Sequence, residues 1–243
     1  MASLQHSLWQ CALWGCLLGG GAALGCGDEG GRSRGAAASP ALQPVAPDAL
    51  APASAAAGMV VDGQLLLDDL TDGDATFAAG GISGEWFTYS DGTSTVTPPD
   101  HSGLLVTDGE THVFGQGFSD WGVGLSAYLR SADLSAFCRL KLRVRGGGAL
   151  VIELATPATS PASEGGTCVG SGCFGHFASN IQLEPAYREL DIAFADLAQP
   201  SWAQRAQLSL AGVISFNLVA KAAPGAPVDI DLWLDRLALG ACP

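Results

Sequence analysis

The chain has 243 residues, of which 48% are hydrophobic and 14% charged, and its formal net charge is −13. Residues 62–120 contain 11 acidic residues and no lysine or arginine, whereas five of the 11 basic residues lie within 130–145. A protein this acidic repels phosphate, so its composition argues against a nucleic-acid partner bound through a basic surface.

Residues 1–25 have the pattern of an export signal. Their apolar stretch, 8–24, contains no Asp, Glu, Lys or Arg, and three consecutive glycines interrupt it, which disfavours a membrane-spanning helix. The stretch ends in Ala-Leu-Gly-Cys at Cys26, which resembles the processing site of bacterial lipoproteins, although Ala23 stands where Leu is usual and no Lys or Arg precedes the stretch. We expect a lipid on Cys26 and an exported chain anchored to a membrane of the cell envelope. Plain secretion is the alternative.

Residues 26–60 are expected to form a flexible tether. They are rich in Gly, Ala, Pro and Ser and contain no aromatic residue, so they offer little from which a core could form. Residues 61–243 are long enough for one folded domain, which we expect to be monomeric.

Short strand-like segments separated by Gly, Pro, Asp and Ser recur through residues 61–243. In 140–144, apolar residues alternate with Lys and Arg, which is the pattern of a half-buried strand. The expected strands are 84–90, 103–106, 112–114, 122–129, 140–144, 150–154, 180–183, 188–194, 213–219 and 228–239. Only 200–210 has the character of a helical turn or loop. Many short strands with glycine-rich turns predict an all-β sandwich or barrel.

The seven cysteines support export. Two leave with the signal and Cys26 takes the lipid, so four remain to form two disulfides, for which three pairings exist. The Gly-Ser-Gly segment between Cys168 and Cys173 is flexible enough to favour a bridge there, which leaves Cys138 and Cys242 for the second bridge.

No catalytic signature is present: the chain lacks His-Glu-x-x-His, Gly-x-Ser-x-Gly and a phosphate loop. Cys168, Cys173 and His176 could bind zinc, but three ligands in an exported protein favour a disulfide beside a structural histidine. We therefore expect no enzymatic activity. The alternative, a glycoside hydrolase, requires two carboxylates close together, and Glu85 and Glu153 are the candidates on strands.

Four carboxylates are concentrated in residues 68–74. They would repel one another unless a hard cation such as Ca²⁺ joined their oxygen atoms. The spacing differs from that of an EF-hand. If the first and last strands are neighbours, Asp235 could complete the site, and the alternative is a solvated turn.

The domain resembles the galactose-binding-like jelly rolls that serve as carbohydrate-binding modules, especially the family 11 type. The motifs are weak individually, and their order carries the resemblance over nearly all of 61–240. They are Asp-Asp-Leu-Thr-Asp-Gly-Asp (68–74), Trp-Phe-Thr-Tyr-Ser-Asp-Gly (86–92), Gly-Val-Gly (122–124), the segment 134–144, the Cys- and His-containing segment 168–176, and Leu-Trp-Leu-Asp-Arg (232–236).

The resemblance implies a jelly-roll β-sandwich of two antiparallel sheets and a structural Ca²⁺. By motif, the metal ligands correspond to Asp69, Asp74 and Asp235. Two departures weaken this site, because Leu70 replaces an aromatic residue and Arg236 replaces a second Asp.

Sugars stack their apolar faces on exposed aromatic rings and pair their hydroxyls with polar side chains. Trp121, Tyr128 and His176 are the candidates for contact with a glycan. Arg143 lies among basic residues on one strand face, and it would favour an acidic or highly hydroxylated glycan if that face is concave; a solvated strand edge is the alternative.

We expect a surface-tethered, non-catalytic lipoprotein that binds a polysaccharide or glycan. The alternative is a structural or protein-interaction envelope lipoprotein without a sugar site.

Overall fold

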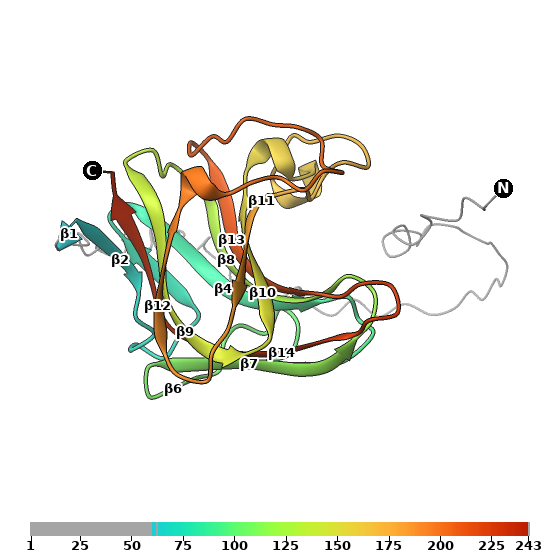
Figure 1. Cartoon of the computed structure of the whole chain (residues 1–243). Helices are drawn as coiled ribbons and strands as arrows, with labels where there is room; N and C mark the ends of the chain where they lie inside the picture. The colour runs from blue at the N-terminus through green and yellow to red at the C-terminus, as the bar shows by residue number, and fades with distance from the viewer. Residues whose placement is uncertain (1–59, 62, 243) are drawn as a thin grey trace, which may run out of the picture. The chain divides into compact units, whose positions relative to one another are not determined.

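The structure is a computed structural model that describes residues 60, 61 and 63–242 (Figure 1). The signal peptide 1–25, the lipid on Cys26 and the tether as far as residue 59 lie outside the described residues and stay predictions. Helical structure in the described part consists of three single-turn 3₁₀ helices, η1 (Pro157–Thr159), η2 (Ala162–Glu164) and η3 (Phe194–Asp196). No helix among these residues is long and apolar enough to cross a membrane.

The first sheet is built around the last strand, β14. It contains β1 (Val60–Val61), β2 (Gln64–Asp68), β5 (Val96–Thr97), β6 (Val106–Thr107), β7 (Glu110–Phe118), β9 (Phe137–Gly147), β12 (Arg188–Ala193) and β14 (Val228–Ala241). One edge of β14 pairs with β9, and its other edge pairs first with β7 and then with β2. Strand β12 extends the sheet beyond β9. Every pairing is antiparallel.

The second sheet has the order β11-β10-β13-β8-β4-β3 and is also antiparallel. Its strands are β3 (Thr76–Ala79), β4 (Ile82–Ser90), β8 (Gly122–Ala132), β10 (Ala149–Ala155), β11 (Phe177–Gln182) and β13 (Val213–Lys221). The two sheets pack face to face, which confirms the jelly-roll β-sandwich of two antiparallel sheets.

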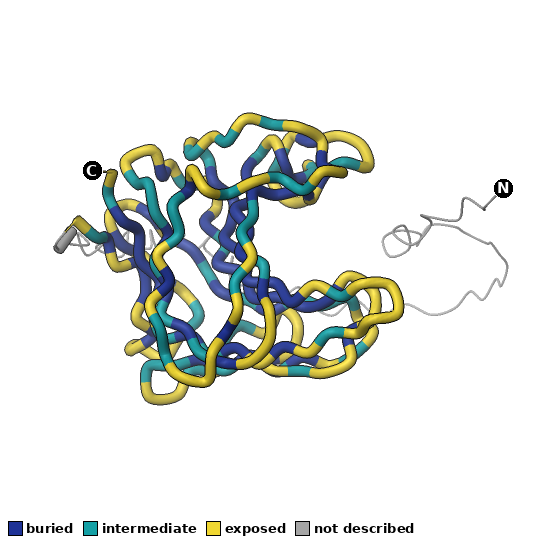
Figure 2. The backbone as a smooth tube through the Cα atoms, viewed as in Figure 1, coloured by how far each residue is buried: buried dark blue, intermediate teal, exposed yellow. Residues whose placement is uncertain are grey.

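The core lies between the sheets, and alternate residues are buried in strands such as β3, β4 and β9, whereas β13 is buried almost throughout (Figure 2). In β9, Leu140, Leu142 and Val144 point inward and the intervening basic residues point outward, as the alternation predicted. The largest fully buried side chain is Trp86, whose indole Nε1–H donates to the buried carboxylate of Asp68 at 2.7 Å. This bond ties β4 of the second sheet to β2 of the first.

Nine of the ten predicted strands coincide with strands of the structure, and the segment 200–210 is a turn followed by a loop. The exception is 103–106, where only Val106 belongs to a strand. The sequence interpretation missed β1, β2, β3 and β5. Strands β1 and β5 have two residues each, and β2 runs directly into the acidic segment 68–74, which was interpreted as a cation site with a solvated turn as the alternative.

The disulfide pairing is as predicted. Cys138 and Cys242 join the start of β9 to the end of β14, with a Cα–Cα distance of 4.9 Å. Cys168 and Cys173 close a short loop, with a Cα–Cα distance of 5.7 Å. Because both sulfurs of the second pair are bonded to each other, the alternative of a zinc site at this loop is wrong.

Candidate functional site

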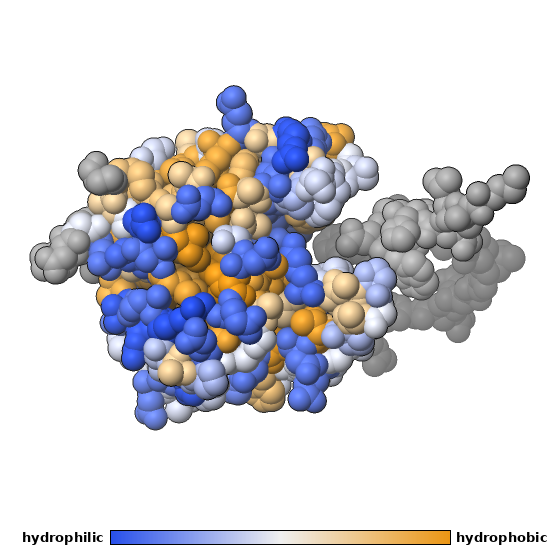
Figure 3. Space-filling view, in the orientation of Figure 1, coloured by the Kyte–Doolittle hydropathy of each residue, from blue (hydrophilic) through white to orange (hydrophobic). Residues whose placement is uncertain are grey.

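The outward face of the second sheet, called here the groove face, carries polar and aromatic side chains. The space-filling surface is hollowed on the right-hand side of Figure 3, between the segment that bears η1 and η2 above and the turn between β13 and β14 below (Figures 1 and 3). In Figure 1 the strands of the second sheet lie to the left of this hollow. Several polar residues of the groove face are largely buried although they point away from the core, among them Ser126, Asn217 and Glu153.

An aromatic strip crosses the groove face and consists of Trp121, Tyr89, Phe87 and Tyr128. The rings of Trp121 and Tyr89 stack with centroids 5.6 Å apart, and Phe87 lies 6.3 Å from Tyr89 and 6.4 Å from Tyr128. Trp121 is 42% exposed. Tyr89 lies flat over Gly124, where a β-carbon would stand 2.6 Å from its ring, so the glycine makes room for the ring.

The strip continues into an open hollow of about 410 Å³ beside Phe87. The ring of His101 contacts Phe87 there, with centroids 5.2 Å apart. The backbone of His101 is left-handed, with φ of 56°, and its N–H donates to the carbonyl of Thr88 at 2.9 Å. This end of the groove face therefore combines an apolar ring with an imidazole.

A row of polar side chains lies next to the strip. The row crosses neighbouring strands and consists of Ser126 on β8, Asn217 on β13 and Glu153 on β10. Ser126 stands opposite Phe87 of β4, where the row meets the aromatic strip. Ser126 Oγ donates to Asn217 Oδ1 at 2.9 Å, and Lys221 Nζ lies 2.5 Å from Glu153 Oε1. Burial raises the pKa of the Glu153 carboxyl, and the charge of Lys221 opposes that rise. The row presents hydrogen-bonding groups beside apolar rings.

The first wall of the groove face is the segment 156–176, which the Cys168–Cys173 bridge closes. Phe174 lies on this wall and is 52% exposed. His176 lies beneath it, 7% exposed, with Nδ1 2.9 Å from the hydroxyl of Thr159. Burial lowers the pKa of His176 to about 4, and the charge of Lys221 acts in the same direction, so the imidazole is neutral at pH 7.

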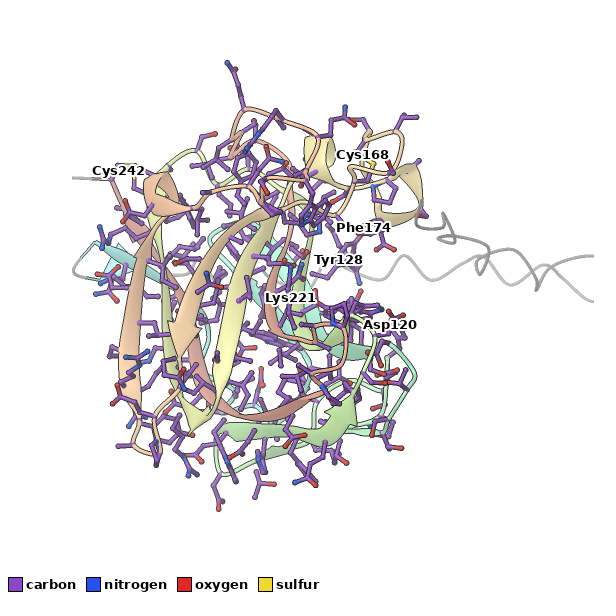
Figure 4. All side chains as sticks on the ribbon, turned by 45° about the vertical axis from the view of Figure 1, so that its right-hand side comes forward. Asp120, Tyr128, Cys168, Phe174, Lys221 and Cys242 are labelled. Atoms are coloured by element: carbon purple, nitrogen blue, oxygen red, sulfur yellow. A yellow bond between two sulfur atoms is a disulfide. The ribbon has the colours of Figure 1, made fainter. Side chains whose placement is uncertain are left out.

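The opposite wall carries Asp120 and Trp121. The carboxylate of Asp91 accepts hydrogen bonds from the backbone N–H groups of Asp120 and Gly122, both at 2.9 Å. Burial acts to raise the pKa of Asp91, but these bonds and those from Thr93 outweigh it, so the pKa is lowered. Figure 4 shows Phe174 and Asp120 on opposite sides of the opening.

Three of the four predicted ligand contacts lie around the groove face: Trp121 on one wall, Tyr128 on the floor and His176 beneath the other wall. Arg143 does not join them. It lies on β9 of the first sheet, where alternation turns it to the outward face of that sheet. There it pairs with Asp235 and lies over the ring of Tyr187, 4.5 Å from the ring centroid.

The sequence interpretation missed Phe87, Tyr89 and Phe174. The first two are the outward residues of β4, and the Trp-Phe-Thr-Tyr pattern contains that alternation, with Trp86 turned to the core. No comparable pattern marks Phe174, because its position depends on the fold of the wall segment.

The predicted calcium ligands Asp69, Asp74 and Asp235 are already paired with other groups. Asp69 and Asp74 each accept hydrogen bonds from the backbone N–H and the hydroxyl of the threonine two residues later. Asp235 pairs with Arg143. Among the described residues, no group of three or more His, Cys, Asp or Glu side chains is placed to hold a metal ion. These three residues therefore do not fit a shared calcium site, and calcium binding stays a prediction.

No protein-family model matches the chain, and neither does any curated protein sequence. Solved structures of family 11 carbohydrate-binding modules are similar. The module of the cellulosomal cellulase Lic26A-Cel5E of Clostridium thermocellum aligns with a TM-score of 0.52 and 18% identity, over 74% of this chain and 95% of that chain. A family 11 module from Clostridium thermocellum in complex with a β-1,3-1,4-mixed-linked tetrasaccharide aligns with a TM-score of 0.51 and 18% identity, over 74% of this chain and 96% of that chain. The chain therefore has the fold of a family 11 carbohydrate-binding module.

Proposed function

We propose that this chain is a surface-tethered, non-catalytic binding lipoprotein that recognises a carbohydrate on the groove face. The aromatic strip carries the proposal. Trp121, Tyr89, Phe87 and Tyr128 form a connected row of rings across the groove face, and Trp121 is exposed at one end of it. An aromatic ring offers a broad apolar surface with a weakly negative face, which suits the C–H groups of a pyranose.

The polar row supports the same ligand class. A sugar ring presents hydroxyls at its edge and C–H groups on its faces, so its site needs both kinds of contact. Ser126, Asn217 and Glu153 stand beside Phe87 and supply donors and acceptors at the floor of the groove face. Few of these groups carry charge, which suits a neutral glycan. The solved module in complex with a β-1,3-1,4-mixed-linked tetrasaccharide makes that oligosaccharide the first ligand to test.

A hydrolase is disfavoured by the placement of its two candidate carboxylates. Glu85 lies on β4 and Glu153 on β10, with β8 and β13 between them. Strands are about 4.8 Å apart, so three steps separate the two backbones by about 14 Å. Glycosidases hold their carboxyl pair about 5 to 9.5 Å apart. Both side chains also have cationic partners, Arg130 and Lys221.

Isothermal titration against a panel of soluble glycans tests the proposal. The mixed-linked tetrasaccharide is the first probe, with calcium present in one series and a chelator in another. Trp121→Ala and Tyr128→Ala should each weaken binding about threefold to tenfold, the usual range for one aromatic contact. Phe114→Ala is the matched control, because Phe114 is 45% exposed on the first sheet.

Two results count against the proposal. Absence of binding to every glycan, combined with capture of an envelope protein, would support the alternative of a structural or interaction lipoprotein. Equal losses in Phe114→Ala and Trp121→Ala would place the ligand elsewhere. The tether has a separate test: the intact mass of the mature chain should include a lipid, and Cys26→Ser should release the protein from membranes.

A further inference from the structure

Phe174 combines a strained backbone with an exposed ring. Its φ is 67°, in the left-handed region that bulky residues rarely adopt. Leu70 is also a large apolar residue of the described part with positive φ, but it is 1% exposed, so core packing accounts for its conformation. Phe174 is 52% exposed, and core packing does not explain it. Strain at an exposed aromatic residue points to a role for the ring in the site.

The wall segment holds this conformation from both sides. The N–H of Phe174 donates to the carbonyl of Thr159 at 2.8 Å, and the residue before it, Cys173, is bonded to Cys168. The residue after it, Gly175, packs so closely that a β-carbon would stand 2.1 Å from that of Ala203. The backbone at Phe174 is therefore fixed before any ligand arrives.

The ring lies at the edge of the groove face. It meets the imidazole of His176 edge-on, with centroids 6.2 Å apart and planes at 83°. Figure 4 places Phe174 at the upper rim of the opening, Tyr128 just below it and Asp120, the neighbour of Trp121, at the lower rim. The aromatic strip and Phe174 thus approach the opening from different walls.

We propose that Phe174 is a specificity-determining contact that holds a saccharide chain from the wall opposite Trp121. This inference rests on the proposed function. A chain that meets rings from two walls must be apolar on more than one side, which favours pyranoses whose hydroxyls are all equatorial. An axial hydroxyl would face one of the rings. The Cys168–Cys173 bridge holds this contact in place.

The test compares Phe174→Asn with the wild-type chain by isothermal titration with the β-1,3-1,4-mixed-linked tetrasaccharide. Asn accepts left-handed backbone readily, so the variant removes the ring and relieves the strain. We expect affinity to fall about threefold to tenfold while the melting temperature does not fall. The preference for a glucose tetrasaccharide over a galactose-based one should shrink as well. Phe114→Ala, on the first sheet, should keep wild-type affinity.

A variant with Cys168→Ser and Cys173→Ser gives a second measurement. It should weaken binding to a similar degree, and adding Phe174→Asn to it should cause little further loss, because both changes remove one contact. Wild-type affinity in Phe174→Asn, or a lower melting temperature with unchanged affinity, overturns the inference and leaves the proposed function intact. A wild-type chain that binds no glycan overturns both.

Discussion

The buried imidazole of His176 makes a quantitative prediction about stability and pH. Its pKa is about 4 in the folded chain and about 6.5 when unfolded, so the unfolded chain takes up the proton first as the pH falls. The contribution of His176 to the free energy of unfolding is therefore complete above about pH 6.5 and is lost as the pH falls toward 4. A pKa difference of about 2.5 corresponds to about 3 kcal/mol of unfolding free energy in total. About 2 kcal/mol of this stability is lost between pH 7 and pH 5.

Urea denaturation of the wild-type chain and of His176→Gln at pH 7 and pH 5 measures this loss. Gln is neutral at both values and can still meet the hydroxyl of Thr159. Burial raises the pKa of Glu153, Asp68 and Asp235, so these carboxyls stabilise the folded chain as the pH falls, opposite to His176. Both proteins share this contribution, so it cancels when their stability losses are compared. The variant should lose about 2 kcal/mol less than the wild type between the two pH values. Equal losses in the two proteins would refute the reasoning.

Further predictions concern the framework. Asp68→Ala should destabilise the fold by about 2 to 4 kcal/mol in urea, because the buried indole N–H of Trp86 loses its acceptor, whereas Asp68→Asn should cost less. Replacing Cys138 and Cys242 by Ser should cost about 4 kcal/mol, since the bridge spans a separation of 104 residues. If the domain binds calcium, its Tm should be higher with calcium than with chelator, and equal Tm values would contradict calcium binding. Arg143→Ala should leave glycan affinity unchanged, and a weaker affinity would tie the first sheet to the ligand.

Local pattern in the sequence predicted much of the fold. Alternation within 140–144 identified a half-buried strand, and the loop composition between Cys168 and Cys173 identified a bridge. The loop-like setting of Trp121 beside Gly122 suggested an exposed ring, and Trp121 is 42% exposed in the structure. These features depend on residues close together in the chain.

The remaining features depend on contacts between distant segments. Alternation shows that Arg143 points away from the core, but it does not show to which sheet β9 belongs. The acidic segment 68–74 suggested a cation, yet Asp69 and Asp74 bond within their own turns, and Asp68 accepts from the distant Trp86. Phe174 could not be found because its backbone conformation is fixed by Thr159 and by the packing of Gly175.

The central position of β14 sets the order in which the domain can form. Strands β2, β7 and β9 all hydrogen-bond to it, although Gln64 of β2 precedes its partner Gly240 by 176 residues. Until residues 228–241 arrive, the first sheet lacks the strand that joins its parts. The first sheet therefore cannot assemble until nearly the whole chain has emerged, which suits a polypeptide that we propose is threaded through a membrane before it folds.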